Sequence, residues 1–308
     1  MASSDLHASE VRTKKINNMV VNKVEFIKPS DTRPVLGADL FPELCCNIFE
    51  CAKKHSGKST TTFSIIKKCA SKETKVIVFC SSLNNDKCWL AIQKYCEDKG
   101  IQFEGHTSIF DEDGDNLVEG LVNRWRSLKE GAEGEEAMGE GDDRMGEQEG
   151  EGSSVSRDPM PVLQFVHTDE SELEETSEKP KKKRKSKFQS PDYLIIFDDV
   201  SVELKNKWVT ALVKIHRHYK SKIILSSQSV VDLAPGARNQ MDYTLIYGGM
   251  PEDKIEKILI CCSLPITLRQ LMKMYKVATK EKYSFLYIDA VNNKYRMNFN
   301  TEIEIPQD

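Results

Sequence analysis

Apolar runs and amphipathic stretches alternate along the chain and predict alternating strands and helices. A short, continuous apolar run is typical of a strand that is buried on both faces of a sheet. Residues 283–299 read as two further strands around an Asn-Asn turn, which predicts a β-hairpin. The continuous apolar runs occupy residues 44–51 (LCCNIFEC), 75–81 (KVIVFCS), 192–200 (DYLIIFDDV), 221–228 (SKIILSSQ) and 242–249 (DYTLIYGG).

Apolar residues at helical spacing lie between these strands and predict four helices. They lie within 56–70, over 89–100 with Gly100 as the end, over 116–128, and from about 203 to 219. Gly is a residue type that often ends a helix. The apolar faces of the first two helices are formed by Phe63, Ile66, Cys69 and Ala70, and by Trp89, Ile92, Tyr95 and Cys96. Strands that alternate with helices pair in parallel through right-handed crossovers, so we expect an α/β fold with a mainly parallel central sheet flanked by helices.

The charge of the chain is segregated. The chain has 44 basic and 48 acidic residues, of which residues 130–187 contain 9 and 17, so the remaining 35 basic and 31 acidic residues give a net charge of +4. The segment begins with EGAEGEEAMGEGDDRMGEQEGEGSS, which has little to bury and predicts disorder. Its apolar island at 161–167 (PVLQFVH) is either a returning strand or a short docking motif.

The acidic segment ends in a basic run, KPKKKRKSK, at residues 179–187. Such a run is typical of a nuclear-import signal or of a nucleic-acid patch, and it could also be a solvated tether. We favour nuclear import, with Lys181, Lys182, Lys183, Arg184 and Lys185 facing an import receptor. The predicted organisation is an N-terminal extension (1–40), the first part of the core (41–128), an acidic insertion (129–190) and the second part of the core (191–308).

The remaining composition limits the class of protein. The 9 cysteines form no CxxC or His/Cys spacing, and their odd number argues against a disulfide framework and a zinc site. Most lie in apolar runs, where cysteine behaves as a small hydrophobic residue, and this indicates a reducing, intracellular compartment. Because no stretch reaches about 18 apolar residues and residues 1–15 have no apolar core, we expect neither a membrane span nor a secretory signal.

Residues 51–62, CAKKHSGKSTTT, match a phosphate-binding P-loop at every position except the first glycine. The pattern is Gly, four residues, then Gly-Lys-Ser/Thr, and Ala52 stands at its first position. The segment follows a predicted strand and opens a predicted helix, which is the context that the pattern requires. The first glycine supplies permissive backbone angles and no phosphate contact, so we expect alanine to be tolerated there.

The residues of this loop have distinct predicted roles. Gly57 allows the backbone to approach the phosphates closely, Lys58 neutralises the terminal phosphates, and the Ser59 hydroxyl holds Mg²⁺. Ser56 and Thr60 complete the predicted nucleotide-binding set.

Polar residues end two of the other predicted strands. Asp198 and Asp199 follow the apolar run LIIF, and ligands of open α/β sheets bind at such strand ends. One carboxylate can hold Mg²⁺ through water, and its neighbour can orient or deprotonate the attacking water. Gln228 is either a γ-phosphate sensor or a loop residue. Arg238, after a Pro-Gly turn, is either an arginine finger for a neighbouring subunit or a surface residue.

Together these segments resemble the FtsK/HerA-type DNA-translocating ATPases. The nearest branch is that of the genome-packaging ATPases of poxviruses, other large DNA viruses and Maverick/Polinton-type elements. The resemblance covers roughly 44–128 and 191–299. It is carried by SGKST, LIIFDDV, HRHYKSKIILSSQ, PGARNQMDYTLIYG and NNKYRMNF.

The resemblance implies a RecA/FtsK-like P-loop NTPase fold with a C-terminal β-hairpin and an ATPase that uses ATP and Mg²⁺. It also implies sequence-independent binding of double-stranded DNA, a homo-oligomeric ring, a capsid or portal-vertex partner, and a place in the host nucleus or the virion. The resemblance implies that Lys58 and Ser59 bind the nucleotide and Mg²⁺, and that Asp198 coordinates Mg²⁺. It also implies that Asp199 is the catalytic carboxylate, that Gln228 is the sensor, and that Arg238 is the arginine finger for a neighbouring subunit.

The sequence departs from that family at two places. Ala52 replaces the first glycine of the P-loop, and the acidic insertion is not part of the family core.

Two other functions stay open. A non-hydrolysing scaffold could keep a structural nucleotide pocket, although it would need fewer of the polar residues described above. A small-molecule P-loop kinase is the other, although no Arg-rich lid stands between the Asp pair and the hairpin.

Overall fold

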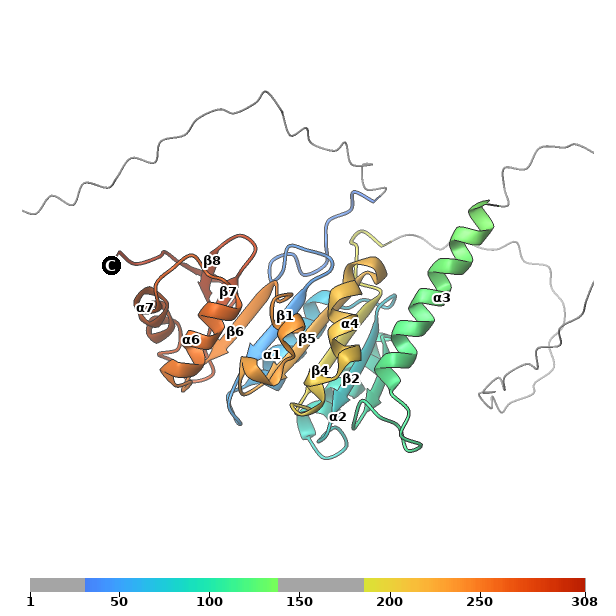
Figure 1. The fold of residues 1–308 in the computed structure, drawn as a ribbon, viewed down its shortest axis with the longest axis horizontal. Helices are drawn as coiled ribbons and strands as arrows, with labels where there is room; N and C mark the ends of the chain where they lie inside the picture. The colour runs from blue at the N-terminus through green and yellow to red at the C-terminus, as the bar shows by residue number, and fades with distance from the viewer. Residues whose placement is uncertain (1–30, 138–185, 308) are drawn as a thin grey trace, which may run out of the picture. The chain divides into compact units, whose positions relative to one another are not determined.

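The fold is described from a computed structural model, which covers residues 31–137 and 186–307 (Figure 1). Arg33–Asp308 form one compact unit, separate from Met1–Thr32. Most of the predicted acidic insertion, the apolar island at 161–167 and the basic residues Lys181–Lys185 lie outside the described residues. Within the described ranges, no helix combines the length and apolar character needed to cross a bilayer.

The strands and helices alternate in the order that the sequence predicts for its main elements. The strands are β1 (Asn47–Cys51), β2 (Lys75–Cys80), β3 (Gln102–His106), β4 (Tyr193–Asp198), β5 (Ser221–Ser227), β6 (Tyr243–Tyr247), β7 (Phe285–Asp289), β8 (Lys294–Met297) and β9 (Thr301–Ile303). The helices are α1 (Lys58–Cys69), α2 (Lys87–Lys99), α3 (Leu117–Ala137), α4 (Lys207–Ile215), α5 (Pro235–Arg238), α6 (Glu252–Cys261) and α7 (Leu268–Ala278). Short 3₁₀ turns are η1 (Glu203–Lys205), η2 (His216–Tyr219) and η3 (Val230–Asp232).

The strands form one sheet in the order β3-β2-β4-β5-β1-β6-β7-β8-β9. Figure 1 shows its middle part, with β6, β1, β5, β4 and β2 following one another from left to right. All pairs from β3 to β6 are parallel, and the pairs from β6 to β9 are antiparallel. The predicted mainly parallel α/β fold with a C-terminal hairpin is therefore confirmed. The strand β5 separates the P-loop strand β1 from β4, which ends in Asp198.

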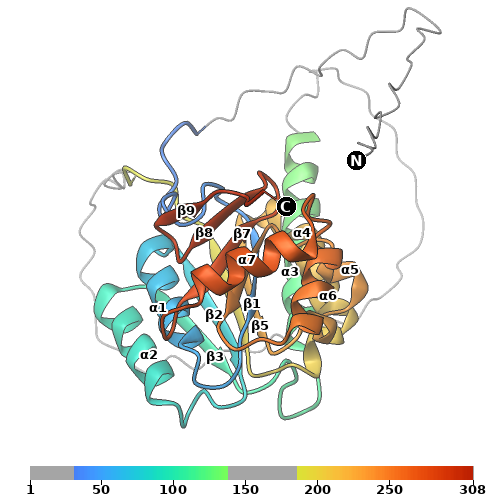
Figure 2. The same ribbon diagram turned by 90° about the vertical axis from the view of Figure 1, so that its left-hand side faces the viewer.

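Helices cover both faces of the sheet (Figure 2). The apolar faces of α1 and α2 pack on one side, where Ile65, Ile66, Trp89 and Ile92 join a buried cluster with the strands. On the other side, α3, α4, α6 and α7 contribute to a second cluster. Since every residue of β1, β5 and β6 is buried, the continuous apolar runs reflect burial on both faces.

Three kinds of element were missed from the sequence. In the described part of the chain, the edge strand β3, with the sequence QFEGH, pairs with β2 alone. Its residues are exposed or half-buried, so it has no apolar run. The helices α6 and α7 are amphipathic and lie in a segment for which no element was predicted. The strand β9 extends the predicted hairpin by one antiparallel neighbour.

The ordered core extends slightly beyond the predicted core segments. Val35 forms a parallel bridge with Gln189, and the Leu36 amide donates to the Gln189 carbonyl at 2.7 Å. Phe41 is fully buried, so residues before position 41 lead directly into the core. The helix α3 continues to Ala137, nine residues past the predicted end at 128.

The side chain of Trp125 anchors α3 to the sheet. It is 1% exposed, and its ring lies 4.5 Å from the ring of Tyr219 and 4.9 Å from that of Tyr193, centroid to centroid. We expect Trp125→Ala to lower the free energy of unfolding by about 3–5 kcal/mol, measured by urea denaturation followed by circular dichroism. The control Leu90→Ala removes a side chain that is 48% exposed and should change stability by less than about 0.5 kcal/mol. Equal effects of the two substitutions would contradict the packing of α3.

Candidate nucleotide-binding site

The loop between β1 and α1 has the backbone of an anion-binding turn. His55 and Gly57 have left-handed φ values of 61° and 94°, and α1 begins at Lys58 directly after Gly57. Within residues 31–137 and 186–307, no side chain caps this end of α1. The amides of the first helical turn therefore point toward the loop, where the helix dipole favours a negative charge. The Ser56 hydroxyl is buried and has no hydrogen-bond partner among the described residues, which fits a phosphate as its missing partner.

Ala52, the departure from the P-loop pattern, is accommodated without strain. The residue is 2% exposed, and its amide donates to the Ser227 carbonyl at 2.9 Å, which continues the ladder between β1 and β5. Its φ is not positive, so the conformational freedom of glycine is not needed here. Alanine is therefore compatible with the loop.

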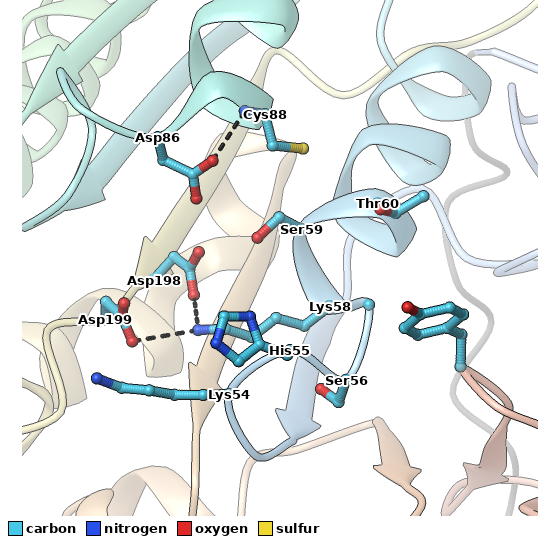
Figure 3. Close-up of a pocket in the computed structure, with 12 residues that line it drawn as sticks. Lys54, His55, Ser56, Lys58, Ser59, Thr60, Asp86, Cys88, Asp198 and Asp199 are labelled. Atoms are coloured by element: carbon cyan, nitrogen blue, oxygen red, sulfur yellow. Dashed lines mark hydrogen bonds and ion pairs between the residues drawn. The ribbon is translucent and has the colours of Figure 1, made fainter.

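Lys58 lies between the two carboxylates predicted to work with it. Its ammonium forms an ion pair with Asp198 and lies 3.4 Å from Asp199 Oδ1 (Figure 3). Burial alone would lower the pKa of Lys58, but the attraction of Asp198, together with Asp199, outweighs it and raises the pKa. The lysine is therefore held as a cation at the carboxyl end of β4.

A tryptophan fixes the orientation of Asp198. The Asp198 side chain is only 6% exposed, and the Trp89 indole donates to its Oδ2 at 3.2 Å. Trp89 belongs to α2, and the sequence predicted it only as a core residue. Since one oxygen faces Trp89 and the other faces Lys58, both carboxylate oxygens have a donor.

Asp199 differs from its neighbour in exposure and backbone geometry. Its side chain is 44% exposed, and its φ of 56° lies in the left-handed region that non-glycine residues rarely adopt. The Ser81 hydroxyl donates to the Asp199 carbonyl at 3.0 Å and supports this turn. Strained residues of this kind cluster at functional sites. Asp199 is thus the acid that is accessible to water.

These residues surround a cavity of about 540 Å³, here called the phosphate cavity. This volume lies in the range of about 300–1,000 Å³ that is typical of small-molecule sites. The predicted residues that line it are Ser56, Gly57, Lys58, Ser59, Thr60, Asp198 and Asp199. It is also lined by Lys54, His55, Asp86, Cys88 and Tyr283 (Figure 3).

The oxygen atoms in this cavity fit a magnesium ion. Mg²⁺ prefers hard oxygen ligands and is usually held by one or two carboxylates together with substrate phosphates. Ser59 and Asp198 supply a hydroxyl and a carboxylate within the same cavity. The Asp198 carboxylate already contacts a cation, the Lys58 ammonium, so this position favours positive charge.

Gln228 and Arg238 do not line the phosphate cavity. Gln228 is exposed directly after β5, between the ends of β1 and β4, and its carbonyl accepts from the Lys254 ammonium at 2.8 Å. Arg238 ends α5, and its guanidinium donates to the carbonyls of Leu233 at 2.8 Å and Val231 at 2.9 Å. These contacts tie the arginine to its own chain.

A buried acid in the strand that leads into the P-loop is a further polar residue, and it was not predicted from the sequence. Glu50 is fully buried in β1, and its Oε2 accepts from Ser226 at 2.7 Å and contacts Thr62 Oγ1 at 3.2 Å. Burial raises the pKa of Glu50 to about 7, against the lowering effect of Ser226. An acidic residue inside the apolar strand NIFEC is a signal that could have revealed it.

The sheet, the loop before α1 and the cavity together are those of a P-loop protein. No family model matches the chain. The chain is 28% identical over 137 residues to the uncharacterized protein 075L of Invertebrate iridescent virus 6, a match that covers 43% of the chain and spans about half (53%) of that relative.

The comparison with solved structures found matches that include a viral genome packaging NTPase. The genome packaging NTPase B204 from Sulfolobus turreted icosahedral virus 2, in complex with AMP, has a TM-score of 0.46 at 14% identity and matches 82% of this chain and 97% of its own. Its complex with ATP-gammaS has a TM-score of 0.44 at 14% identity, over 86% of this chain and 100% of its own. B204 from Sulfolobus Turreted Icosahedral Virus, a DNA-packaging ATPase, has a TM-score of 0.44 at 15% identity and matches 82% of this chain and 95% of its own.

The raised pKa of Glu50 predicts a specific dependence of stability on pH. The pKa is about 7 in the folded chain against an ordinary 4.5, so the proton stabilises the folded state below pH 4.5, and this contribution is lost as the pH rises to 7. Glu50→Gln mimics the protonated acid. We expect the variant to gain stability relative to the parent protein between pH 4.5 and 7, by about 3 kcal/mol at most.

Urea denaturation at pH 5 and pH 8 measures this difference. The control Glu73→Gln changes an exposed acid and should show the same small effect at both pH values. A Glu50→Gln effect that does not change with pH would contradict the proposed protonation of Glu50.

Proposed function

We propose that this chain is an ATPase that moves double-stranded DNA, and that its task is to package the DNA of a virus or a virus-like element into a capsid. The observation that supports hydrolysis most directly is the position of Lys58 between Asp198 and Asp199. A phosphate-binding lysine, a buried acid and an exposed acid meet there at the end of the sheet. A nucleotide-binding scaffold would not need the exposed acid.

ATP binding changes the partners of Lys58. The triphosphate brings several negative charges into the phosphate cavity, so the ammonium exchanges its carboxylate partners for phosphate oxygens. The amides at the start of α1 and the Ser56 hydroxyl donate to the phosphates. Bound Mg²⁺ neutralises charge on the terminal phosphates, and Ser59 and Asp198 are the residues that would hold it.

Asp199 then orients the attacking water and accepts its proton. Its carboxylate is accessible to water, and the residue directly follows β4, which pairs with β5. Gln228, which directly follows β5 and does not line the phosphate cavity, is proposed as the γ-phosphate sensor. A finger role for Arg238 in a neighbouring subunit would require its guanidinium to leave the carbonyls of Val231 and Leu233.

The proposal that ATP hydrolysis is coupled to DNA movement is supported by the motifs that resemble packaging ATPases, in particular those between residues 216 and 248. Outside the acidic segment at 130–187, the chain carries 35 basic and 31 acidic residues, which permits contacts with phosphates that do not read the base sequence. We also propose a homo-oligomeric ring, a capsid or portal-vertex partner, and nuclear import through Lys181–Lys185.

ATP hydrolysis with and without linear double-stranded DNA tests this function. We expect DNA to stimulate turnover, and Lys58→Ala to reduce it by about a hundredfold or more because the terminal phosphates lose their cation. The control Lys94→Ala removes an exposed lysine of α2 and should leave turnover unchanged. Binding of ATP without turnover, at protein concentrations where the chain oligomerises, would contradict the motor and favour a scaffold.

A further inference from the structure

Tyr283 stands at the junction of the phosphate cavity and a second cavity. The second cavity has a volume of about 450 Å³ and is lined by residues of the P-loop, of the turn after β6 and of the loop between α7 and β7. Lys54, His55, Ser56 and Tyr283 line both cavities. A ligand whose phosphates occupy the first cavity can therefore extend into the second past the ring of Tyr283.

The backbone of Tyr283 is held in an unfavourable conformation. Its φ of 68° lies in the left-handed region, which is rare for a bulky aromatic residue. The neighbouring residue Ser284 is buried and its amide donates to the Glu281 carbonyl at 3.3 Å, so the loop is fixed around the tyrosine. The side chain itself is 57% exposed. Conformations of this kind persist where the surrounding structure enforces them, and they cluster at ligand sites.

The ring packs against the residue that opens the P-loop helix. A Cβ atom added to Gly57 would lie 3.2 Å from Cδ1 and 3.3 Å from Cβ of Tyr283. Gly57 therefore leaves room for this ring in addition to allowing the backbone to approach the phosphates. Lys58, the next residue, reaches instead to Asp198 and Asp199. The tyrosine thus adjoins the P-loop at Gly57, while the carboxylates hold the ammonium of Lys58.

The remaining walls of the second cavity leave space for a flat group. Gly248 and Gly249 contribute no side chains to it, and Gly249 has a φ of 80°. The ammonium of Lys282 lies 4.7 Å from the centre of the Tyr283 ring. Because Lys282 is an exposed lysine, this contact is weak, and a stacked ligand can replace it.

We infer that the base of the bound nucleotide lies in the second cavity and stacks on Tyr283. The inference rests on the proposed ATP binding and extends it from the phosphates of the ligand to its base. Every nucleobase has a π-face, so stacking on a tyrosine supplies affinity without reading hydrogen-bonding groups of the base. The ligand class is a nucleoside triphosphate, bound through its base as well as its phosphates.

Isothermal titration calorimetry of the full chain with MgATP and with magnesium tripolyphosphate separates the two parts of the ligand. We expect ATP to bind more tightly than tripolyphosphate, and Tyr283→Ala to weaken ATP binding by about fivefold to a hundredfold, the usual range for one stacked base. The same substitution should leave tripolyphosphate binding unchanged. Tyr283→Phe keeps the ring and should bind ATP like the parent protein.

The possible contrary results distinguish this inference from the proposed function. Unchanged ATP binding by Tyr283→Ala would overturn the stacking while leaving the nucleotide site intact. An equal loss for ATP and tripolyphosphate would also overturn it, because the tyrosine would then shape the P-loop and not hold the base. If the parent protein bound neither ligand, the proposed ATPase function would fail as well. Lys58→Ala should weaken the binding of both ATP and tripolyphosphate.

Discussion

The ion pair between Lys58 and Asp198 is the constraint on which the site depends. It joins the loop after β1 to the end of β4, although β5 lies between these two strands. A buried charge without a partner costs several kcal/mol, so neither side chain can leave unless another charge replaces it. Phosphates for the lysine and a divalent cation for the aspartate are such replacements. The arrangement therefore favours a phosphorylated ligand that brings a metal ion with it.

The polar residues around this pair connect it to the core. The Trp89 indole holds the second oxygen of Asp198 from α2, and Glu50 lies in β1 beneath the helix that follows the P-loop. Ser226 of β5 donates to Glu50, so adjacent central strands share one buried carboxyl group. Because Glu50 is buried and Asp198 nearly so, the packing of helices on both faces of the sheet sets the geometry of the site.

The sequence predicted the parts of the protein that depend on local pattern. Strands buried on both faces are continuous apolar runs, and the P-loop and the Asp pair stand at the ends of such runs, so both the fold and the phosphate cavity could be expected. The edge strand β3 was missed because its outer side is exposed. Tyr283 and Trp89 reach the site only through folding, since 226 and 109 positions separate them from Gly57 and Asp198, respectively. No spacing rule reveals contacts of that kind.

A crystal structure of the chain with a non-hydrolysable ATP analogue and Mg²⁺ tests the central claim most directly. We expect the Lys58 ammonium to leave Asp198 and to contact the terminal phosphates, and we expect Ser59 and Asp198 to hold the metal ion. The claim would be contradicted by a nucleotide bound outside the phosphate cavity. A complex in which the Lys58–Asp198 pair stays unbroken beside a bound triphosphate would contradict it equally.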